Sequence, residues 1–191
     1  MTRRQRPGKN IDDFGVIASL HSVPLAMTRY RQGELMTKLK VGDKAPDFNL
    51  LASNGKNISL KDYRGTKNMV IYFYPKDDTP GCTVQACGFR DSIKTIEKQG
   101  AVVLGVSADS IKSHEKFIQK FNLPFLLLSD ETKKMCQDYD VIAQKSMFGK
   151  KYLGIVRTTF VINKEGKIAE IFENVKPQGH NDEVAAVLKN F

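Results

Sequence analysis

The sequence predicts an α/β domain, and three observations support this class. Strands covered on both faces are expected for two continuous apolar runs, Met69 to Tyr74 and Val102 to Ser107. A helix is expected between them, because Val84 to Lys98 has helical spacing and is followed by Gly100, a residue type that often ends helices. Polar turn sequences between shorter apolar segments indicate hairpins on either side of this unit.

The elements before and after this unit follow from the same kinds of signal. Near the start, Phe48 to Leu51 and Ile58 to Leu60 flank Ser53-Asn54-Gly55-Lys56, which predicts a hairpin with an Asn-Gly turn. The later part of the chain is predicted to contain, in order, a helix at Ser110 to Phe121, a strand at Phe125 to Leu128, a short helix at Thr132 to Tyr139, a hairpin made by Val156 to Ile162 and Ile168 to Phe172, and a final helix at His180 to Leu188.

The first 35 residues are predicted to be an extension outside the domain. They lack a clear hydrophobic period and are rich in Arg, Ser, Thr and Gly. The pair Asp12-Asp13 argues against a transit peptide, and polar residues and a proline interrupt Ile17 to Met27, which makes a poor signal-peptide core. Two interpretations stay open: a disordered tail, or a start placed upstream of the true one at Met36. In both, residues 36 to 191 form the domain.

Composition restricts the class of protein further. Hydrophobic residues make up 41% of the 191 residues and charged residues 27%, as in ordinary compact enzymes. No apolar stretch approaches the roughly 20 residues that a membrane span needs, so no membrane association is expected. The three cysteines do not form the framework of a small secreted domain, which favours a reducing compartment and hence a cytoplasmic location.

The net charge of +9 does not indicate a nucleic-acid partner. Residues 36 to 191 retain +6 of it, so most of the excess is spread through the domain. Lysines alternate with carboxylates, as in Lys112 to Lys120 and Lys61 to Arg64, and the sequence has no basic stripe interleaved with aromatic residues. A solvated surface explains this pattern better than nucleic-acid binding does.

A pair of cysteines is the most informative feature for function. Cys82 and Cys87 follow the apolar run Met69 to Tyr74 and the turn-rich segment Pro75 to Gly81, where a strand is predicted to end and a helix to begin. The first turn of a helix offers unpaired N–H groups and the positive end of the helix dipole, and both favour a thiolate. A nucleophilic sulfur is therefore expected at this junction.

The spacing of these two cysteines adds a constraint. Residues five apart on a helix have Cα atoms roughly 8.6 Å apart. A disulfide usually needs a Cα separation of about 4.4 to 6.8 Å, so Cys82 and Cys87 could not bond within an intact helix. Either the segment is not helical, or the helix unwinds during a catalytic cycle in which Cys82 is oxidised and Cys87 attacks it.

Residues around Cys82 complete a longer motif. Pro75, Thr79 and Cys82 match the pattern of a proline, three residues, a threonine, two residues and a cysteine, and Arg157 is the candidate for a distant arginine. This arrangement resembles the peroxiredoxin family, in particular its peroxiredoxin Q or bacterioferritin comigratory protein branch, from about residue 39 to residue 191. The resemblance implies a thioredoxin-like fold with peroxiredoxin additions, in which a central mixed sheet is flanked by helices and preceded by a β-hairpin.

The resemblance also implies an activity, that of a thiol-dependent peroxidase for hydrogen peroxide and organic hydroperoxides. In this assignment Cys82 attacks the peroxide and becomes a sulfenic acid, and Cys87 resolves it to an intramolecular disulfide. Thioredoxin or a similar external dithiol then restores both thiols. No bound cofactor is implied, and an intramolecular resolving cysteine removes the need for a dimer, so a monomer is expected.

The chemistry of peroxide reduction assigns roles to the other motif residues. Attack on the O–O bond needs a deprotonated sulfur and donors aimed at both peroxide oxygens. Thr79 would supply a hydroxyl, and Arg157 a permanent charge with several N–H donors. Pro75, which lacks an N–H and has a fixed φ, would shield the pocket from water. The carboxylates Asp77 and Asp78 would disfavour the thiolate if they faced it, so both are predicted to point to solvent.

Alternatives to this interpretation remain. The cysteines could be buried small hydrophobes, Thr79 a turn or cap residue, and Arg157 a strand residue that reaches the surface or pairs with a carboxylate. A zinc site made from the three cysteines and a histidine lacks the usual paired spacing, and a plant-type iron–sulfur motif fails because position 90 is Arg. Cys136, in a predicted short helix, is expected to be structural.

Two other functions fit the same scaffold. A thiol-based redox sensor or chaperone-like binding protein would use slow oxidation and unwinding to expose a surface for a partner. A thioredoxin-like disulfide oxidoreductase is disfavoured, because the sequence has no Cys-x-x-Cys spacing.

Overall fold

The computed structural model describes residues 30–31, 34–35, 37–147 and 150–191. Residues 1–29 and 32–33 of the predicted extension, and Met36 at the predicted start of the domain, therefore lie outside the described residues. The four described residues of that stretch form two short antiparallel strands, β1 (Tyr30–Arg31) and β2 (Glu34–Leu35).

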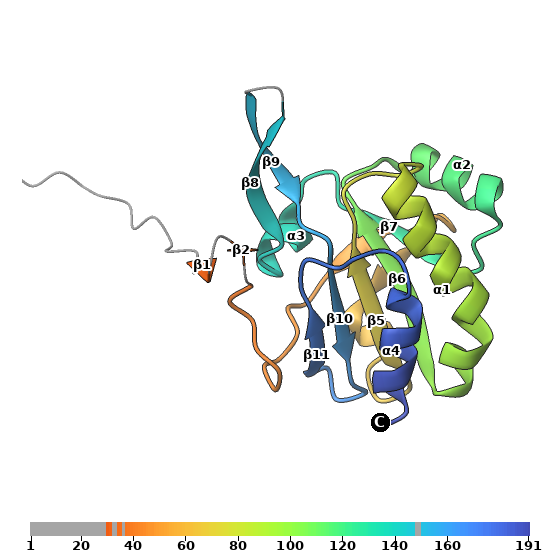
Figure 1. Ribbon diagram of the computed structural model, residues 1–191. Helices are drawn as coiled ribbons and strands as arrows, with labels where there is room; N and C mark the ends of the chain where they lie inside the picture. Colours follow the sequence, from red (N-terminus) through yellow and green to blue (C-terminus); the bar gives the residue numbers. More distant parts are fainter. Residues whose placement is uncertain (1–29, 32–33, 36, 148–149) are drawn as a thin grey trace, which may run out of the picture.

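A five-stranded mixed sheet forms the centre of the domain (Figure 1). Its order is β11-β10-β5-β6-β7, with β5, β6 and β7 parallel and β10 and β11 antiparallel to their neighbours. The predicted class, a central mixed sheet flanked by helices, is confirmed. The strands are β5 (Asn68–Phe73), β6 (Ala101–Ser107), β7 (Leu126–Ser129), β10 (Thr158–Ile162) and β11 (Ile168–Phe172).

Strand β5 shows why the two apolar runs form the middle of this sheet. All six of its residues are buried, and successive side chains enter cores on opposite faces. On one face Tyr72 packs with residues of α1 (Pro80–Lys98), α2 (Ile111–Phe121) and α4 (His180–Leu188). On the other face Phe73 packs with residues of α3 (Lys134–Asp138) and of the segment before β5. A strand that is covered on both faces has apolar residues at successive positions and does not alternate apolar with polar ones.

The predicted N-terminal hairpin is present as β3 (Asn49–Leu51) and β4 (Asn57–Ser59), paired antiparallel. Gly55 in its turn has φ 76°, a left-handed conformation that glycine adopts without strain. Leu60, predicted as the end of the second strand, instead begins a short 3-10 helix, η1 (Leu60–Asp62). The Asp62 carboxylate accepts hydrogen bonds from the backbone N–H and hydroxyl of Ser59 and so ends the strand there.

The predicted later hairpin is present as β10 and β11, but another hairpin, between α3 and β10, was not predicted from the sequence. It consists of β8 (Ile142–Met147) and β9 (Lys150–Ile155), which pair antiparallel and project from the rest of the domain (Figure 1). Its described side chains are mostly exposed or half-buried, so the sequence carries little hydrophobic periodicity. Its presence shortens the following predicted strand, because β10 begins at Thr158 rather than at Val156.

None of the helices in the described ranges combines the length and the apolar character needed to cross a membrane.

Helix α4 is joined to the sheet through a buried histidine. The His180 side chain lies between the rings of Phe89 and Phe172. Its Nε2 is 2.9 Å from the Thr159 hydroxyl and its Nδ1 is 3.1 Å from the Glu183 carboxylate. Burial lowers the pKa of His180, and the raising effect of Glu183 does not offset it. A neutral ring fits these contacts, with Nδ1–H donating to Glu183 and the Thr159 hydroxyl donating to Nε2.

Stability should therefore fall when the pH drops below the ordinary histidine value of about 6.5. The lowered pKa of His180 means that the unfolded chain binds a proton at this site more readily than the folded chain, so acid favours unfolding. The free energy of unfolding, measured with urea between pH 7.5 and 5, should show this decline. In the His180→Gln variant the decline should be flatter. We expect the variant to be less stable at pH 7.5 by about 1–3 kcal/mol. An equally steep decline in the variant would assign the pH dependence to other groups.

Candidate active site

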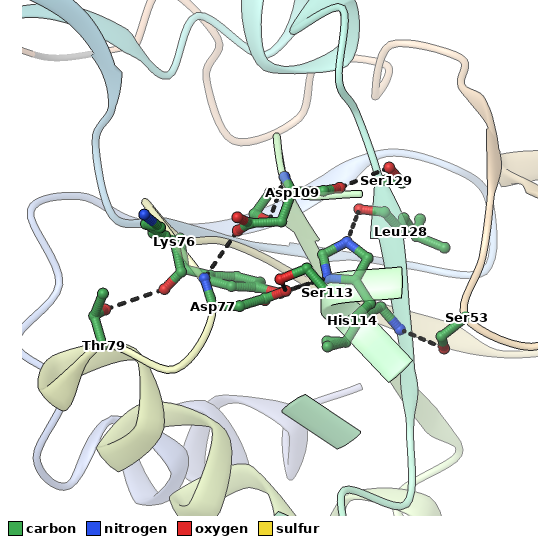
Figure 2. A network of polar contacts seen from close by, with 12 residues as sticks. Ser53, Lys76, Asp77, Thr79, Asp109, Ser113, His114, Leu128 and Ser129 are labelled. Atoms are coloured by element: carbon green, nitrogen blue, oxygen red, sulfur yellow. Dashed lines mark hydrogen bonds and ion pairs between the residues drawn. The ribbon is translucent and has the colours of Figure 1, made fainter. Parts of the chain in front are cut away.

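The predicted junction between a strand and a helix lies at the end of β5. The chain leaves β5 at Phe73, turns, and enters α1 at Pro80, four residues earlier than the sequence pattern predicted. Proline suits this first helical position, because its missing N–H would have no partner in the helix. Thr79 is the N-cap residue, but its hydroxyl donates to the carbonyl of Lys76 at 3.0 Å rather than capping the helix (Figure 2).

Cys82 lies in the first turn of α1, with only 2% of its surface exposed. An Arg157 Nη2 donor is 3.3 Å from its sulfur. Gly81 allows this approach, since a Cβ there would meet the guanidinium at 3.3 Å. A permanent cation and the N-terminal end of a helix both stabilise a thiolate at this position.

Arg157 is held by a residue that the sequence analysis did not single out. Its Nη1 donates to the Gln85 Oε1 at 2.6 Å, and Gln85 is itself buried. Gln85 lies three residues after Cys82 on α1, which places both side chains on one face of the helix. Arg157 is not a strand residue, because it lies in the link between β9 and β10. The signal for Gln85 was its helical spacing from the cysteine.

Cys87 lies in the same unbroken helix as Cys82, and both thiols are free. The segment is therefore helical in this state, which removes the first of the two alternatives that the spacing left open. A disulfide between these cysteines requires the first turns of α1 to unwind. Cys87 is only half-buried, so unwinding does not have to expose it from the core.

The remaining motif residue and the third cysteine lie apart from this contact. Pro75 is exposed at the start of the turn. Cys136 is buried with α3 in the core on the opposite face of the sheet from Cys82. Burial, together with the nearby Asp130 carboxylate, raises the pKa of the Cys136 thiol. That thiol is therefore a poor nucleophile.

The prediction that both acidic residues of the turn point to solvent was wrong for one of them. Asp78 is exposed and its carboxylate is 2.7 Å from the Lys120 ammonium. Asp77 is buried, with 6% exposed, and His114 lies 2.9 Å from its carboxylate. Burial by itself would raise the pKa of Asp77, but hydrogen bonds from His114 and other donors hold it below its ordinary value. Hydrogen bonds from buried partners offset the free-energy cost of burying this carboxylate.

Two further polar side chains lie in the same region as Cys82. Lys145, on the unpredicted strand β8, donates to the Ile155 carbonyl at 2.7 Å. Burial and the charge of Arg157 lower its pKa, and Cys82 acts in the opposite direction. The buried Tyr72 hydroxyl has no hydrogen-bond partner in the described part of the chain, and burial raises its pKa. Within the described ranges no three His, Cys, Asp or Glu side chains gather as a metal site would require.

The fold and this site together define a class of protein, a thioredoxin-like α/β protein with a buried cysteine thiol at a helix N-terminus. Comparison with known families specifies it further. Residues 41–171 match the model of the AhpC/TSA family, and the chain belongs to that family. Within it the chain is a peroxiredoxin of the peroxiredoxin Q or Bcp branch, and hence an oxidoreductase.

Relatives and solved structures agree on this branch. A putative peroxiredoxin Bcp of Coxiella burnetii is 53% identical over 78% of this chain and 99% of its own. Peroxiredoxin Bcp of Bacillus subtilis is 47% identical over 80% and 96%. The structure of Xanthomonas campestris peroxiredoxin Q is 42% identical with a TM-score of 0.73, covering 81% of this chain and 97% of that one.

The contact between Gln85 and Arg157 gives a prediction for the reaction rate. In Gln85→Leu the guanidinium loses its 2.6 Å partner and is free to leave the sulfur. We expect the reaction of reduced Cys82 with hydrogen peroxide, followed by stopped-flow, to slow about tenfold, the value of one charged hydrogen bond. The exposed neighbour Val84, replaced by alanine, is the control and should leave the rate unchanged. An unchanged rate in Gln85→Leu would show that Arg157 needs no such support.

Proposed function

We propose that the chain reduces hydrogen peroxide and organic hydroperoxides through Cys82. One observation carries this proposal: the sulfur of Cys82 lies at the N-terminus of α1 and within 3.3 Å of the Arg157 guanidinium. The thiolate attacks one peroxide oxygen, the O–O bond breaks, and the other oxygen leaves as an alkoxide or hydroxide that takes up a proton. Cys82 is thereby oxidised to a sulfenic acid and the peroxide is reduced to an alcohol or water.

The neighbouring donors support this step. Negative charge develops on the leaving oxygen, and fixed donors in a site that excludes water stabilise it best. Arg157 supplies a guanidinium of which one nitrogen is already held by Gln85. The Thr79 hydroxyl, at the N-cap of the same helix, would donate to peroxide or accept its proton after turning from the Lys76 carbonyl. Pro75 would cover the entrance when the substrate is bound.

Cys87 is proposed to complete the first half of the cycle. The Cys87 thiol loses its proton and attacks the Cys82 sulfur, a disulfide forms as the S–O bond breaks, and the hydroxide that leaves takes up that proton to become water. The unwinding that this needs is favoured by an N-terminus without a side-chain cap. In Xanthomonas campestris peroxiredoxin Q, serine variants have been made at cysteines 36 positions apart. The same count from Cys82 reaches Ile118, so a cysteine at that distance is not available here.

The proposed cycle has consequences for partners. An external dithiol must reduce the disulfide, and thioredoxin is the reductant we propose. The reaction needs no bound cofactor or metal, because sulfur carries both electrons. Resolution within one chain makes a monomer sufficient, and a cytoplasmic location would supply the reducing environment.

A relative supports the proposed substrates. The bacterioferritin comigratory protein of Xanthomonas campestris, described for its alkyl peroxide reduction activity, is 41% identical with a TM-score of 0.73. It covers 81% of this chain, and this chain covers 98% of it. Organic hydroperoxides are therefore included in the proposal beside hydrogen peroxide.

Peptide mapping after one equivalent of hydrogen peroxide tests the cycle. The reduced wild type should form a Cys82 to Cys87 disulfide rapidly, Cys82→Ser should form none, and Cys87→Ser should accumulate a sulfenic acid on Cys82. Cys136→Ser is the matched control, because its thiol is buried away from this site, and should behave as the wild type does. Slow oxidation, or a disulfide that includes Cys136, would instead favour a redox sensor.

A further inference from the structure

Hydrogen-bond donors surround the carboxylate of Asp77, which lies in the turn between β5 and α1 (Figure 2). One of its oxygens accepts from the Tyr74 hydroxyl at 2.7 Å. The other accepts from the Ser113 hydroxyl at 2.7 Å and faces the His114 Nδ1 at 2.9 Å. This carboxylate therefore ties the turn after β5 to helix α2. The contacts with Tyr74 and His114 are buried, and the contact with Ser113 is half-buried.

The protons on His114 follow from its two partners. The ring is fully buried, with Nε2 3.2 Å from the Leu128 carbonyl and Nδ1 beside the Asp77 carboxylate. A carbonyl oxygen and an ionised carboxylate can only accept hydrogen bonds. Both ring nitrogens must then donate, which requires a proton on each and makes the ring an imidazolium cation. With both protons in place, Asp77 and His114 would form a buried ion pair whose formal charges cancel.

The second buried histidine shows that this arrangement is specific. His180 also faces a carboxylate with one nitrogen, but its other nitrogen meets the Thr159 hydroxyl, which can donate. A neutral ring satisfies His180. At His114 the hydroxyl of Tyr74 is 3.5 Å from Nδ1, but it donates to the Asp77 carboxylate at 2.7 Å, so a neutral ring would leave Nδ1 without a donor. The same chain thus holds two buried histidines with opposite expected protonation.

The charged and titratable groups around the pair come from four elements. Tyr74 belongs to the turn after β5, Ser113 to α2, and the Leu128 carbonyl to β7. Asp109, after β6, is the other nearby carboxylate, and it accepts from the Asp77 N–H at 2.8 Å and from the Ser107 hydroxyl at 2.8 Å. Among the described residues, His114 is the only basic side chain paired with either of these two carboxylates.

The pair lies within electrostatic reach of the reactive sulfur. The Tyr74 hydroxyl donates to Asp77, and the Tyr74 ring stacks on that of Tyr72 with 5.3 Å between centroids. Both tyrosines pack in the same buried core cluster as Cys82. Arg157 lies 3.3 Å from the sulfur itself, and Lys145 on β8 donates to the carbonyl of Ile155, two residues before Arg157. A free negative charge at Asp77 would oppose these two cations and disfavour the thiolate.

We propose that His114 is a buried, doubly protonated counter-ion that holds Asp77 in the turn between β5 and α1 and cancels its charge near Cys82. His114 is thus a positioning residue, since it touches neither the sulfur nor a substrate. The proposal rests on the proposed role of Cys82 as the nucleophile. It explains why a carboxylate is tolerated five residues before a thiolate.

The protonation of His114 can be observed directly in the wild-type chain. A ¹⁵N spectrum of imidazole-labelled protein at pH 7.5 should show one histidine with protons on both ring nitrogens, assigned to His114 through its loss in His114→Asn. The same spectrum contains an internal control, because His180 should appear as a neutral ring with its proton on Nδ1. A neutral His114 at this pH overturns the proposal. This readout does not depend on peroxidase activity.

The effect on Cys82 is measured by the pH midpoint of its alkylation in the reduced chain. In His114→Asn a neutral amide N–H replaces Nδ1–H, so a hydrogen bond to Asp77 can remain while the cation is lost. We expect the midpoint to rise by about one pH unit, as an unpaired charge at this range would cause. Adding Asp77→Asn should return the midpoint to within a few tenths of the wild-type value, since the double variant buries no unpaired charge.

The adjacent acidic residue provides the matched control. Asp78 makes an exposed ion pair with Lys120 and has φ 52°, a conformation that asparagine adopts well. Asp78→Asn should leave the alkylation midpoint unchanged.

A role in stability alone predicts a different pattern. It would lower the unfolding temperature of His114→Asn without moving the midpoint, and that result overturns the proposal, as does a double variant that stays shifted. If instead the proposed function fails, wild-type Cys82 will not react with peroxide, while the spectrum and the midpoints keep their expected values.

Discussion

The contact between the Arg157 guanidinium and the Cys82 sulfur is the interaction on which the site depends. It joins the link between β9 and β10 to the first turn of α1, two segments 75 residues apart in the sequence. Neither segment could hold the other if the sheet did not place β10 beside β5. The antiparallel pairing of β10 with β5 brings Thr158 opposite Phe73, so Arg157 enters at the end of the strand that leads to the cysteine. The topology of the sheet thus sets the position of the Cys82 sulfur beside Arg157.

Two charged groups near the Cys82 sulfur have partners in different parts of the site. Arg157 contacts the thiol, whereas the Asp77 carboxylate lies in the preceding turn and is neutralised there by His114. A buried ion pair contributes little net stability, because desolvation offsets most of the attraction. Its value here is geometric, since it binds the turn to α2 and β7 through hydrogen bonds that allow one arrangement. The turn can then present Cys82 without adding a negative charge beside it.

Most of the fold was predictable because its strands and helices carry strong periodic signals. The β3–β4 hairpin followed from an Asn-Gly turn, and β5 and β6 from runs that are apolar throughout. The β8–β9 hairpin gave no such signal, because its strands pair mainly with each other and bury few side chains. At the site, the positions of Cys82, Thr79 and Arg157 followed from a motif. The burial of Asp77 could not be predicted from the sequence, because it depends on His114, 37 residues away, and on the packing of α2 against β7.

Helix α1 has to satisfy two opposed requirements if Cys87 is to resolve Cys82. Its far part is fixed, because Phe89 and Ile96 are fully buried in the core beneath it. Its first turn has no side-chain cap and is held instead by the contacts of Arg157 with Cys82 and Gln85. Oxidation of the sulfur would add an oxygen beside the Arg157 guanidinium and so change the contact that holds this turn. The chemistry of the first step would then release the segment that the second step must move, while the buried residues keep the rest of the helix in place.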